Sequence, residues 1–269
     1  MSAGPLCAVV VALSVSAAYA QDPAAEFMAR VGDYVQRFVD AFSNVVAEER
    51  YEPGPGRRER QRLRSDYLLV RSPGTQDTFI TFRDVVEVNG KPLRNQKERL
   101  TKLFLQPSEN PLEQARAVSA HSERYLPPTT DPLLALVFLQ REYQARFRYT
   151  LGERDPGLAP DVRRIGFVET QVPTILGRAD GSDLTTQGAA WVSETTGRVF
   201  KTELQFVGEE LTLTTVFGID DTLRIDVPIE MSESFSASGV AVKGVARYSR
   251  FRRFGVRTDE TIDTPEPGR

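Results

Sequence analysis

Apolar residues recur every three or four positions between residues 27 and 46, which predicts an amphipathic helix of about six turns. Asp22 and Pro23 stand before this segment and are typical of a helix N-cap and first turn. The run Pro53-Gly54-Pro55-Gly56 ends the helix, because no regular element crosses two prolines and two glycines. The apolar positions are Phe27, Val31, Tyr34, Phe38, Phe42, Val45 and Val46.

From residue 57 the period of the pattern changes to two. Arginines occupy one parity of Arg57–Val70 and apolar residues the other, which predicts a strand with one basic face. Thr78–Val88 is rich in β-branched and aromatic residues and predicts a second strand. Asn89-Gly90 favours a tight hairpin turn, because both central residues of that turn need a positive φ. The alternating arginines are Arg58, Arg60, Arg62 and Arg64.

Residues 95–140 return to helical spacing, and prolines divide them into three predicted helices. The third, Leu133–Gln140, is apolar nearly all round, which is typical of a buried helix. From residue 142 onward, turn signals separate segments of strand character. The predicted strands are Tyr143–Leu151, Val162–Thr170, Thr174–Arg178, Ala189–Ser193, Arg198–Val207, Leu211–Phe217, Leu223–Ile229 and Val240–Phe254.

The order of these elements predicts the fold class. Strands that follow one another through short turns form an antiparallel meander, and a large sheet tends to curl. A sheet that is apolar on one face buries that face against helices. We therefore expect an α+β fold: a curled antiparallel sheet, or half-barrel, with the N-terminal amphipathic helix and further helices on its concave face.

The first twenty residues are typical of an export signal. Leu6–Ala18 is an apolar run without charge, and Ala18-Tyr19-Ala20 places small residues where signal peptidase cleaves. The run is shorter than the about 20 residues that a membrane span needs. We expect a signal peptide over residues 1–20 and a periplasmic or secreted protein that begins at Gln21. A single domain over residues 21–258 and a disordered tail over 259–269 complete the predicted organisation.

Composition excludes several classes of function. Cys7 is the only cysteine and lies inside the predicted signal, so we expect neither disulfides nor thiolate chemistry. The net charge of −3 argues against nucleic acid as the main partner. No segment after the signal approaches the length of a transmembrane helix, so we expect none in the processed protein.

Few residues offer catalytic or metal chemistry. His121 is the only histidine, which excludes a site with two histidine ligands and favours a surface position. The sequence has no nucleophile elbow, phosphate-cradling loop or dinucleotide fingerprint, so we expect no catalytic residue, no metal and no cofactor. Asp180-Gly181-Ser182-Asp183 lacks the spacing and terminal glutamate of a calcium loop and favours a plain turn.

Paired carboxylates leave one enzymatic route, a carboxylate-dependent hydrolase. The candidates are Glu48-Glu49, near the end of the predicted first helix, and Asp220-Asp221, in a loop before a strand. Adjacent carboxylates on a helix point to different faces, and aspartates before a strand are expected for turn formation. We therefore interpret both pairs as structural.

Two groups of residues are candidates for binding. The arginines at positions 58, 60, 62 and 64 could contact anionic headgroups or an acidic envelope partner, or form a solvated face that protects an edge strand. Aromatic and leucine side chains could line a cavity beneath a curled sheet, or pack together as ordinary core. The candidate lining residues are Phe38, Phe42, Leu136, Phe138, Phe147, Trp191, Phe206 and Phe217.

Three short motifs resemble the LolA/LolB-like superfamily of periplasmic lipoprotein carriers and receptors. Residues 190–199, Ala-Trp-Val-Ser-Glu-Thr-Thr-Gly-Arg-Val, resemble that superfamily's tryptophan hairpin, and Val227-Pro228-Ile229-Glu230-Met231 is similar to its P-x-x-M strand. Residues 244–254 are similar to its final strand. The resemblance covers most of residues 22–254, but residues 95–140 are longer than in the core of the superfamily. It is also compatible with another exported bacterial group that has a similar half-barrel.

This resemblance implies a non-catalytic carrier or envelope sensor. It would hold a lipid, acyl chain or lipoprotein in the concavity by burial of apolar surface, without a cofactor. The helix Leu133–Gln140 would act as a lid, and the N-terminal helix would cover the open sheet. A protein–protein interaction module of the cell envelope is the alternative, and a carboxylate-dependent hydrolase is a third, less favoured one.

Overall fold

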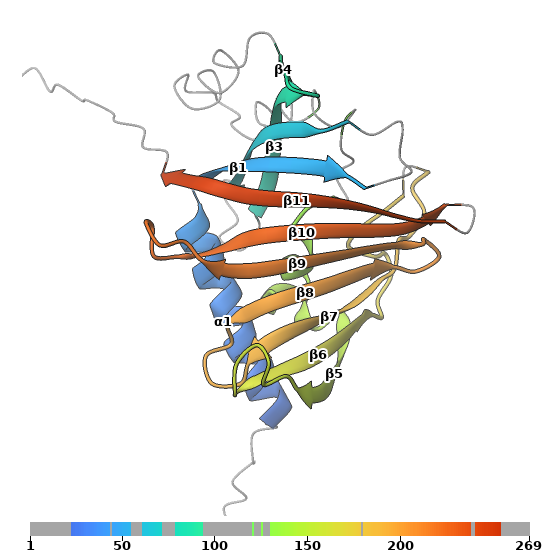
Figure 1. Cartoon of the computed structure of the whole chain (residues 1–269). Coiled ribbons are helices and arrows are strands. Elements are labelled where there is room, and N and C mark those ends of the chain that lie inside the picture. Colours follow the sequence, from blue (N-terminus) through green and yellow to red (C-terminus); the bar gives the residue numbers. More distant parts are fainter. Residues whose placement is uncertain are drawn as a thin grey trace, which may run out of the picture.

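A computed structural model describes residues 23–43, 45–54, 61–71, 79–93, 120, 125, 130–178, 180–237 and 240–253. The described strands form one antiparallel sheet of eleven strands, and three described helices accompany it (Figure 1). The predicted signal peptide, the predicted helices between residues 95 and 128, His121 and the tail 259–269 lie outside the described residues.

The first helix is shorter than the sequence pattern predicts. Helix α1 spans Pro23–Phe42, and strand β1 follows over Val45–Pro53. The prediction of helix through Val46 is therefore wrong. Phe42, Val45 and Val46 continue the spacing of three and four, and all are buried, but Val45 and Val46 lie on a strand paired on both sides. A short apolar run is compatible with both the helical and the strand period, so pairing with neighbouring strands determines that Val45 and Val46 form a strand.

Strands β1 to β4 form the first meander. Strand β2 spans Leu63–Arg71, β3 spans Phe79–Val88 and β4 is the short Lys91–Pro92. Strand β2 thus begins six residues after Arg57, where the sequence pattern placed its start. Asn89 and Gly90 connect β3 to β4 with φ values of 51° and 80°, which confirms the predicted turn.

The second meander follows two short helices, α4 over Leu134–Val137 and α5 over Arg141–Gln144. The segment Leu133–Gln140 is largely buried as predicted, but only Leu134–Val137 form α4, and Tyr143 belongs to α5 instead of a strand. The predicted strand Thr174–Arg178 is reduced to a single bridge between Gly177 and Asp183. The seven strands are β5 Phe147–Arg154, β6 Val162–Glu169, β7 Thr186–Ser193, β8 Val199–Phe206, β9 Leu211–Ile219, β10 Asp226–Ala237 and β11 Val240–Arg253.

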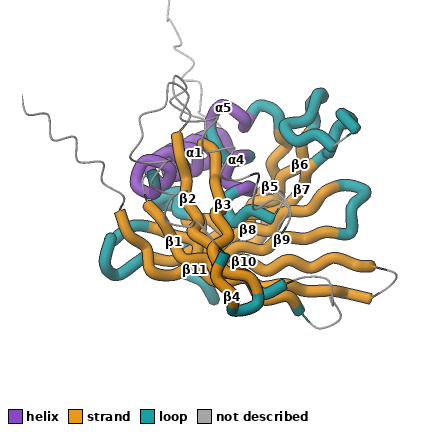
Figure 2. Tube along the Cα trace, turned by 90° about the horizontal axis from the view of Figure 1, so that it is seen from above, coloured by secondary structure: helices purple, strands orange, loops and turns teal. Residues whose placement is uncertain are grey.

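The two meanders join where β1 pairs antiparallel with β11, so the spatial order is β4-β3-β2-β1-β11-β10-β9-β8-β7-β6-β5. The sheet curls around α1, α4 and α5, which lie together on its inner side (Figure 2). This arrangement confirms the predicted fold class, an open curled antiparallel sheet with helices on its concave face. Among the described helices, none has the length and apolar character to cross a membrane.

Candidate functional site

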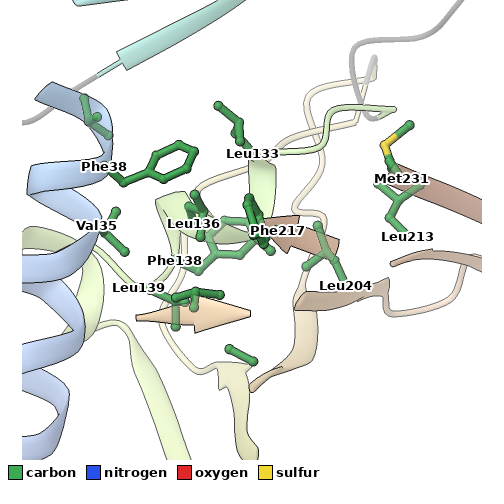
Figure 3. Packing of buried hydrophobic residues seen from close by; sticks show 14 of the residues in the cluster. Val35, Phe38, Leu133, Leu136, Phe138, Leu139, Leu204, Leu213, Phe217 and Met231 are labelled. Carbon is green, nitrogen blue, oxygen red and sulfur yellow. The ribbon is translucent and has the colours of Figure 1, made fainter. Parts of the chain in front are cut away.

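The inner face of the sheet carries a continuous apolar cluster that α1 and residues 130–139, here called the α4 segment, complete. Phe38 of α1 stacks on Phe42 with ring centroids 5.6 Å apart, and its edge meets Phe217 of β9 at 5.8 Å. Figure 3 shows Phe38 and Val35 of α1, the four labelled residues between Leu133 and Leu139, and Phe217 of the sheet converging on one space. Helix α1, the α4 segment and the sheet therefore share one hydrophobic core.

The α4 segment packs against the far end of the sheet through aromatic rings. Phe138 lies 5.2 Å from Phe147 of β5 and 6.1 Å from Phe167 of β6, measured between ring centroids. Leu133, Leu136, Phe138 and Leu139 have no exposed surface. The described part of the inner face is thus packed side chain against side chain.

The eight side chains that the sequence proposed as a cavity lining do not all share this face. Trp191 points to the outer face, where it lies between the Arg164 guanidinium, at 5.6 Å, and the Lys201 ammonium, at 4.2 Å. Its neighbours Ala190 and Val192 face inward, because side chains alternate along a strand. The placement of Trp191 with the lining is therefore wrong. The others are buried in the inner cluster: Phe38, Phe42, Leu136, Phe138, Phe147, Phe206 and Phe217.

Polar contacts fix the α4 segment at its two ends. At its start, Asp131 accepts hydrogen bonds from the Leu133 amide at 2.7 Å, from the Tyr67 hydroxyl at 3.0 Å and from Thr81. At its end, the Tyr149 hydroxyl donates to the Phe138 carbonyl at 2.6 Å. The residues between these ends contribute apolar side chains to the cluster.

A buried ion pair lies beside the start of the α4 segment. Arg83 of β3 donates to Glu49 of β1 at 2.7 Å and to the Thr130 carbonyl at 2.8 Å. The Tyr248 hydroxyl of β11 donates to the same Glu49 carboxylate at 2.9 Å. Three strands and the α4 segment therefore meet at one charged cluster inside the core.

Burial and charge shift the titration of this cluster. Burial raises the pKa of Asp131 above its ordinary 3.8, although Thr81 and Arg83 favour the charged form. Burial also raises the pKa of Tyr67 and of Tyr248, so both hydroxyls stay protonated donors. Burial alone would lower the pKa of Arg83, but the carboxylate of Glu49 outweighs that effect and raises it. Arg83 is therefore a permanent cation.

The pair Glu48-Glu49 lies on β1 and not on a helix, which corrects the sequence interpretation of its position. The two carboxylates still point to opposite faces, because residues alternate along a strand. Glu48, on the outer face, accepts from Arg50 at 2.8 Å and from Arg250 at 3.1 Å. Burial alone would raise the pKa of Glu48, but Arg50, Arg250 and Arg64 hold it below its ordinary 4.5. Arg50 stands two residues further along β1, whereas Arg64 and Arg250 come from the neighbouring strands β2 and β11, so no local motif in the sequence indicates these last two partners.

The predicted arginine ladder is only partly described. Arg58 and Arg60 lie outside the described residues, Arg62 precedes β2, and Arg64 lies on β2. Arg64 donates twice to Glu87 of β3, from Nε at 3.1 Å and from Nη2 at 2.9 Å. Arg62 and Arg64 line a pocket of about 300 Å³ with Arg50 of β1. The structure thus brings together two ladder residues and one arginine that sequence reasoning did not select.

Asp220 and Asp180 form turn contacts with their own loops. Asp220 accepts hydrogen bonds from the amides of Thr222 and Leu223, at 3.1 and 2.7 Å, which is a turn contact. Asp180 accepts from the amide and the hydroxyl of Ser182 in the same way. Within the described residues, no three histidine, cysteine, aspartate or glutamate side chains are grouped to hold a metal ion.

Comparisons with known proteins add similar folds. No family model matches the chain, and no curated protein matches it. Similar solved structures include a "putative outer membrane lipoprotein-sorting protein domain" from Vibrio parahaemolyticus, 12% identical, with a TM-score of 0.44, over 88% of this chain and 93% of that one. A LolA superfamily protein from Nitrosomonas europaea is 13% identical, with a TM-score of 0.41, over 84% and 94%. A DUF1329 family protein from Desulfovibrio piger is 10% identical, with a TM-score of 0.38, over 87% and 94%.

The solved structures thus include the superfamily whose motifs the sequence resembles.

Proposed function

We propose that this protein is a non-catalytic, exported binding protein that holds an acyl chain on the inner face of its sheet. The observation that carries the proposal is the α4 segment, which fills the apolar concavity and is fixed by polar contacts at its two ends. Its predicted place outside the cytoplasm rests on the signal-like residues 1–20.

An acyl chain is a chemical substitute for the side chains of this segment. Leu133, Leu136, Phe138 and Leu139 offer only apolar surface to the cluster around them. Burial of apolar surface contributes about 25 cal/mol per Å², or about 0.8 kcal/mol per methylene group, whichever molecule supplies it. A chain of methylene groups could therefore replace these side chains when the segment moves outward.

Helix α1 provides a second wall that stays in place. Arg30 of α1 donates to the Glu194 carbonyl in the β7–β8 turn at 3.1 Å. Asp33 of α1 forms an ion pair with Arg141 of α5 at 2.7 Å. In the proposed bound state α1 and the sheet remain together, and the α4 segment exchanges its place with the ligand.

The first experiment is native mass spectrometry of protein purified from cell envelopes without detergent. A bound lipid-sized adduct that denaturation releases supports the proposal. Purified protein is then titrated with a fluorescent fatty acid. Absence of both an adduct and saturable fatty-acid binding would overturn the proposal.

A pair of tyrosine variants tests the role of the α4 segment. Tyr149→Phe removes the hydrogen bond to the Phe138 carbonyl, which favours the outward position by about 1 kcal/mol and raises fatty-acid affinity by roughly fivefold. Tyr143→Phe is the matched control, because its hydroxyl makes no hydrogen bond with any described residue. Equal affinities for the two variants would contradict displacement of the segment.

A further inference from the structure

A polar pocket opens at the end of the first meander, and only two of its lining residues, Tyr51 and Leu63, also belong to the inner apolar cluster. Its volume is about 300 Å³, and its lining comes from β1, from the start of β2, and from the end of β3 with its turn. Three arginines and two glutamates supply its charged groups: Arg50, Arg62, Arg64, Glu52 and Glu87. A pocket with this lining is unsuited to an acyl chain and suited to a charged group.

The three guanidinium groups differ in how many of their donors are already used. Arg64 is occupied by its two hydrogen bonds to Glu87. Arg50 donates its Nε to Glu48 at 2.8 Å, and its terminal nitrogens make no hydrogen bond with any described residue. The exposed Arg62 guanidinium has neither a hydrogen bond nor an ion pair with any described residue. Among the described residues of this pocket, Arg62 therefore leaves an excess of positive charge and unused hydrogen-bond donors.

The acidic residues of the pocket do not neutralise Arg62. Glu87 is held by Arg64, and Glu52 lies 3.8 Å from Arg247 of β11. Strand pairing fixes the backbone positions of Arg50 and Arg64, which stand opposite each other in the register of β1 and β2. The backbone of Arg62 is fixed by two bonds to Asn89, its amide donating to the Asn89 side chain at 3.0 Å and its carbonyl accepting from the Asn89 amide at 2.8 Å.

We propose that this pocket binds a phosphate group, with Arg62 and the terminal nitrogens of Arg50 as donors. A guanidinium presents paired N–H groups that match two oxygens of a phosphate. A phosphate also offers enough oxygens to accept from two arginines at once. The phosphate comes either from a lipid headgroup or from a soluble phosphate, and the chemistry of recognition is the same for both.

The test begins with inorganic phosphate and the purified protein. Titration calorimetry in a phosphate-free buffer is expected to give saturable binding, and Arg62→Gln is expected to weaken it at least about fivefold. Arg148→Gln is the matched control, because Arg148 is exposed on β5 at the opposite end of the sheet and its guanidinium has no partner among the described residues. Equal losses in the two variants would show only a diffuse charge effect and would overturn the proposal.

A second variant predicts a gain of binding. Glu87→Gln removes a negative charge from the pocket and releases Arg64 from its ion pair, so phosphate affinity is expected to rise by roughly threefold or more. An unchanged or lower affinity of Glu87→Gln, with its fold verified by circular dichroism, would contradict phosphate binding at this place. A rise in phosphate affinity cannot result from unfolding. The Glu87→Gln variant therefore tests the proposal even if Arg62→Gln is unstable.

Vesicles distinguish the two sources of phosphate. Binding to phosphatidylglycerol vesicles but not to phosphatidylcholine vesicles, with loss in Arg62→Gln and competition by inorganic phosphate, assigns the pocket to an anionic headgroup. Binding of inorganic phosphate without vesicle binding assigns it to a soluble phosphate. Absence of both overturns the proposal. These outcomes do not depend on fatty-acid binding, because phosphate recognition uses the charged side chains of the pocket and no side chain of the α4 segment.

Discussion

The guanidinium of Arg83 on β3 reaches across β2 to the carboxylate of Glu49 on β1, with 2.7 Å between Nη2 and Oε1. The two strands are not neighbours in the sheet, since β2 separates them. Glu49 stands opposite Ser65 of β2, whose short side chain leaves space for the contact. The pair therefore ties β1 to β3 across β2 and, through the Thr130 carbonyl, ties both strands to the α4 segment.

Removal of one partner of this pair is expected to destabilise the fold strongly. Arg83→Leu leaves the Glu49 carboxylate buried and without its cation, which costs about 3–5 kcal/mol in the free energy of unfolding. Urea denaturation measures this change. In the double variant Glu49→Leu and Arg83→Leu, the Glu49 carboxylate no longer lies buried without its cation, so much of the loss is expected to be recovered. A double variant as unstable as the sum of the two single variants would contradict this account.

The β7–β8 turn presses its glycine against the backbone of α1. A Cβ on Gly197, whose φ is +74°, would lie 2.3 Å from the Arg30 carbonyl oxygen, and backbone cannot move aside. Gly181→Ala is the control, because Gly181 has a φ of +82° and nothing within 4 Å of its Cβ position. The control is expected to lose about 1 kcal/mol from backbone strain alone, and Gly197→Ala distinctly more. Similar melting temperatures of the two variants would contradict a close contact between the turn and α1.

Glu48 gives the protein an acid-sensitive contribution to stability. Its pKa in the folded state lies below 4.5, because Arg50, Arg250 and Arg64 favour the carboxylate. The contribution is therefore complete above about pH 4.5 and is lost as the pH falls through the folded-state pKa. In Glu48→Gln, the free energy of unfolding is expected to lie below that of the natural protein at pH 6, with the difference shrinking as the pH falls below 4.5. A difference that is constant with pH would disprove the role of these arginines.

Trp191 is the only tryptophan, so its fluorescence reports on the outer face. The cations of Arg164 and Lys201 beside its ring attract anions. The ratio of the iodide to the caesium quenching constant is therefore expected to be about twice the ratio measured for free N-acetyltryptophanamide at low ionic strength. Lys201→Gln is expected to reduce this ratio. A ratio equal to that of the free amide would contradict the cationic surroundings of Trp191.

Local patterns in the sequence predict most strands but not every side-chain face. Alternation and turn residues locate the meanders, and Asn89-Gly90 marks its turn by a requirement for positive φ that few residues meet. Strand β1 escapes prediction because Val45 and Val46 continue the helical spacing of α1. The apolar character of Trp191 favours a place among the lining residues. Its position in β7 instead directs its side chain to the outer face, between two cations.

The polar groups of the candidate sites could not be paired from the sequence. Arg83 and Glu49 become partners only through the order of three strands. Arg62 and Arg64 belong to the same alternating arginine pattern in the sequence. Of the two, only Arg64 forms an ion pair with a described residue of this pocket, and its partner, Glu87, lies on the next strand. Periodicity indicates which face a residue takes in a strand, and only tertiary structure selects its partner.

The pairing of β1 with β11 places the seam of the sheet between the first and last described strands. Each meander consists of contacts between strands that are close in sequence, and such contacts form early and at low entropic cost. The seam joins residues 45–53 to residues 244–253, the most distant pairing in the described sheet. Removal of β11 would therefore leave two separate half-sheets and expose the unpaired edges of β1 and β10. The concave face, which needs both halves, is expected to be the last part of the molecule to assemble.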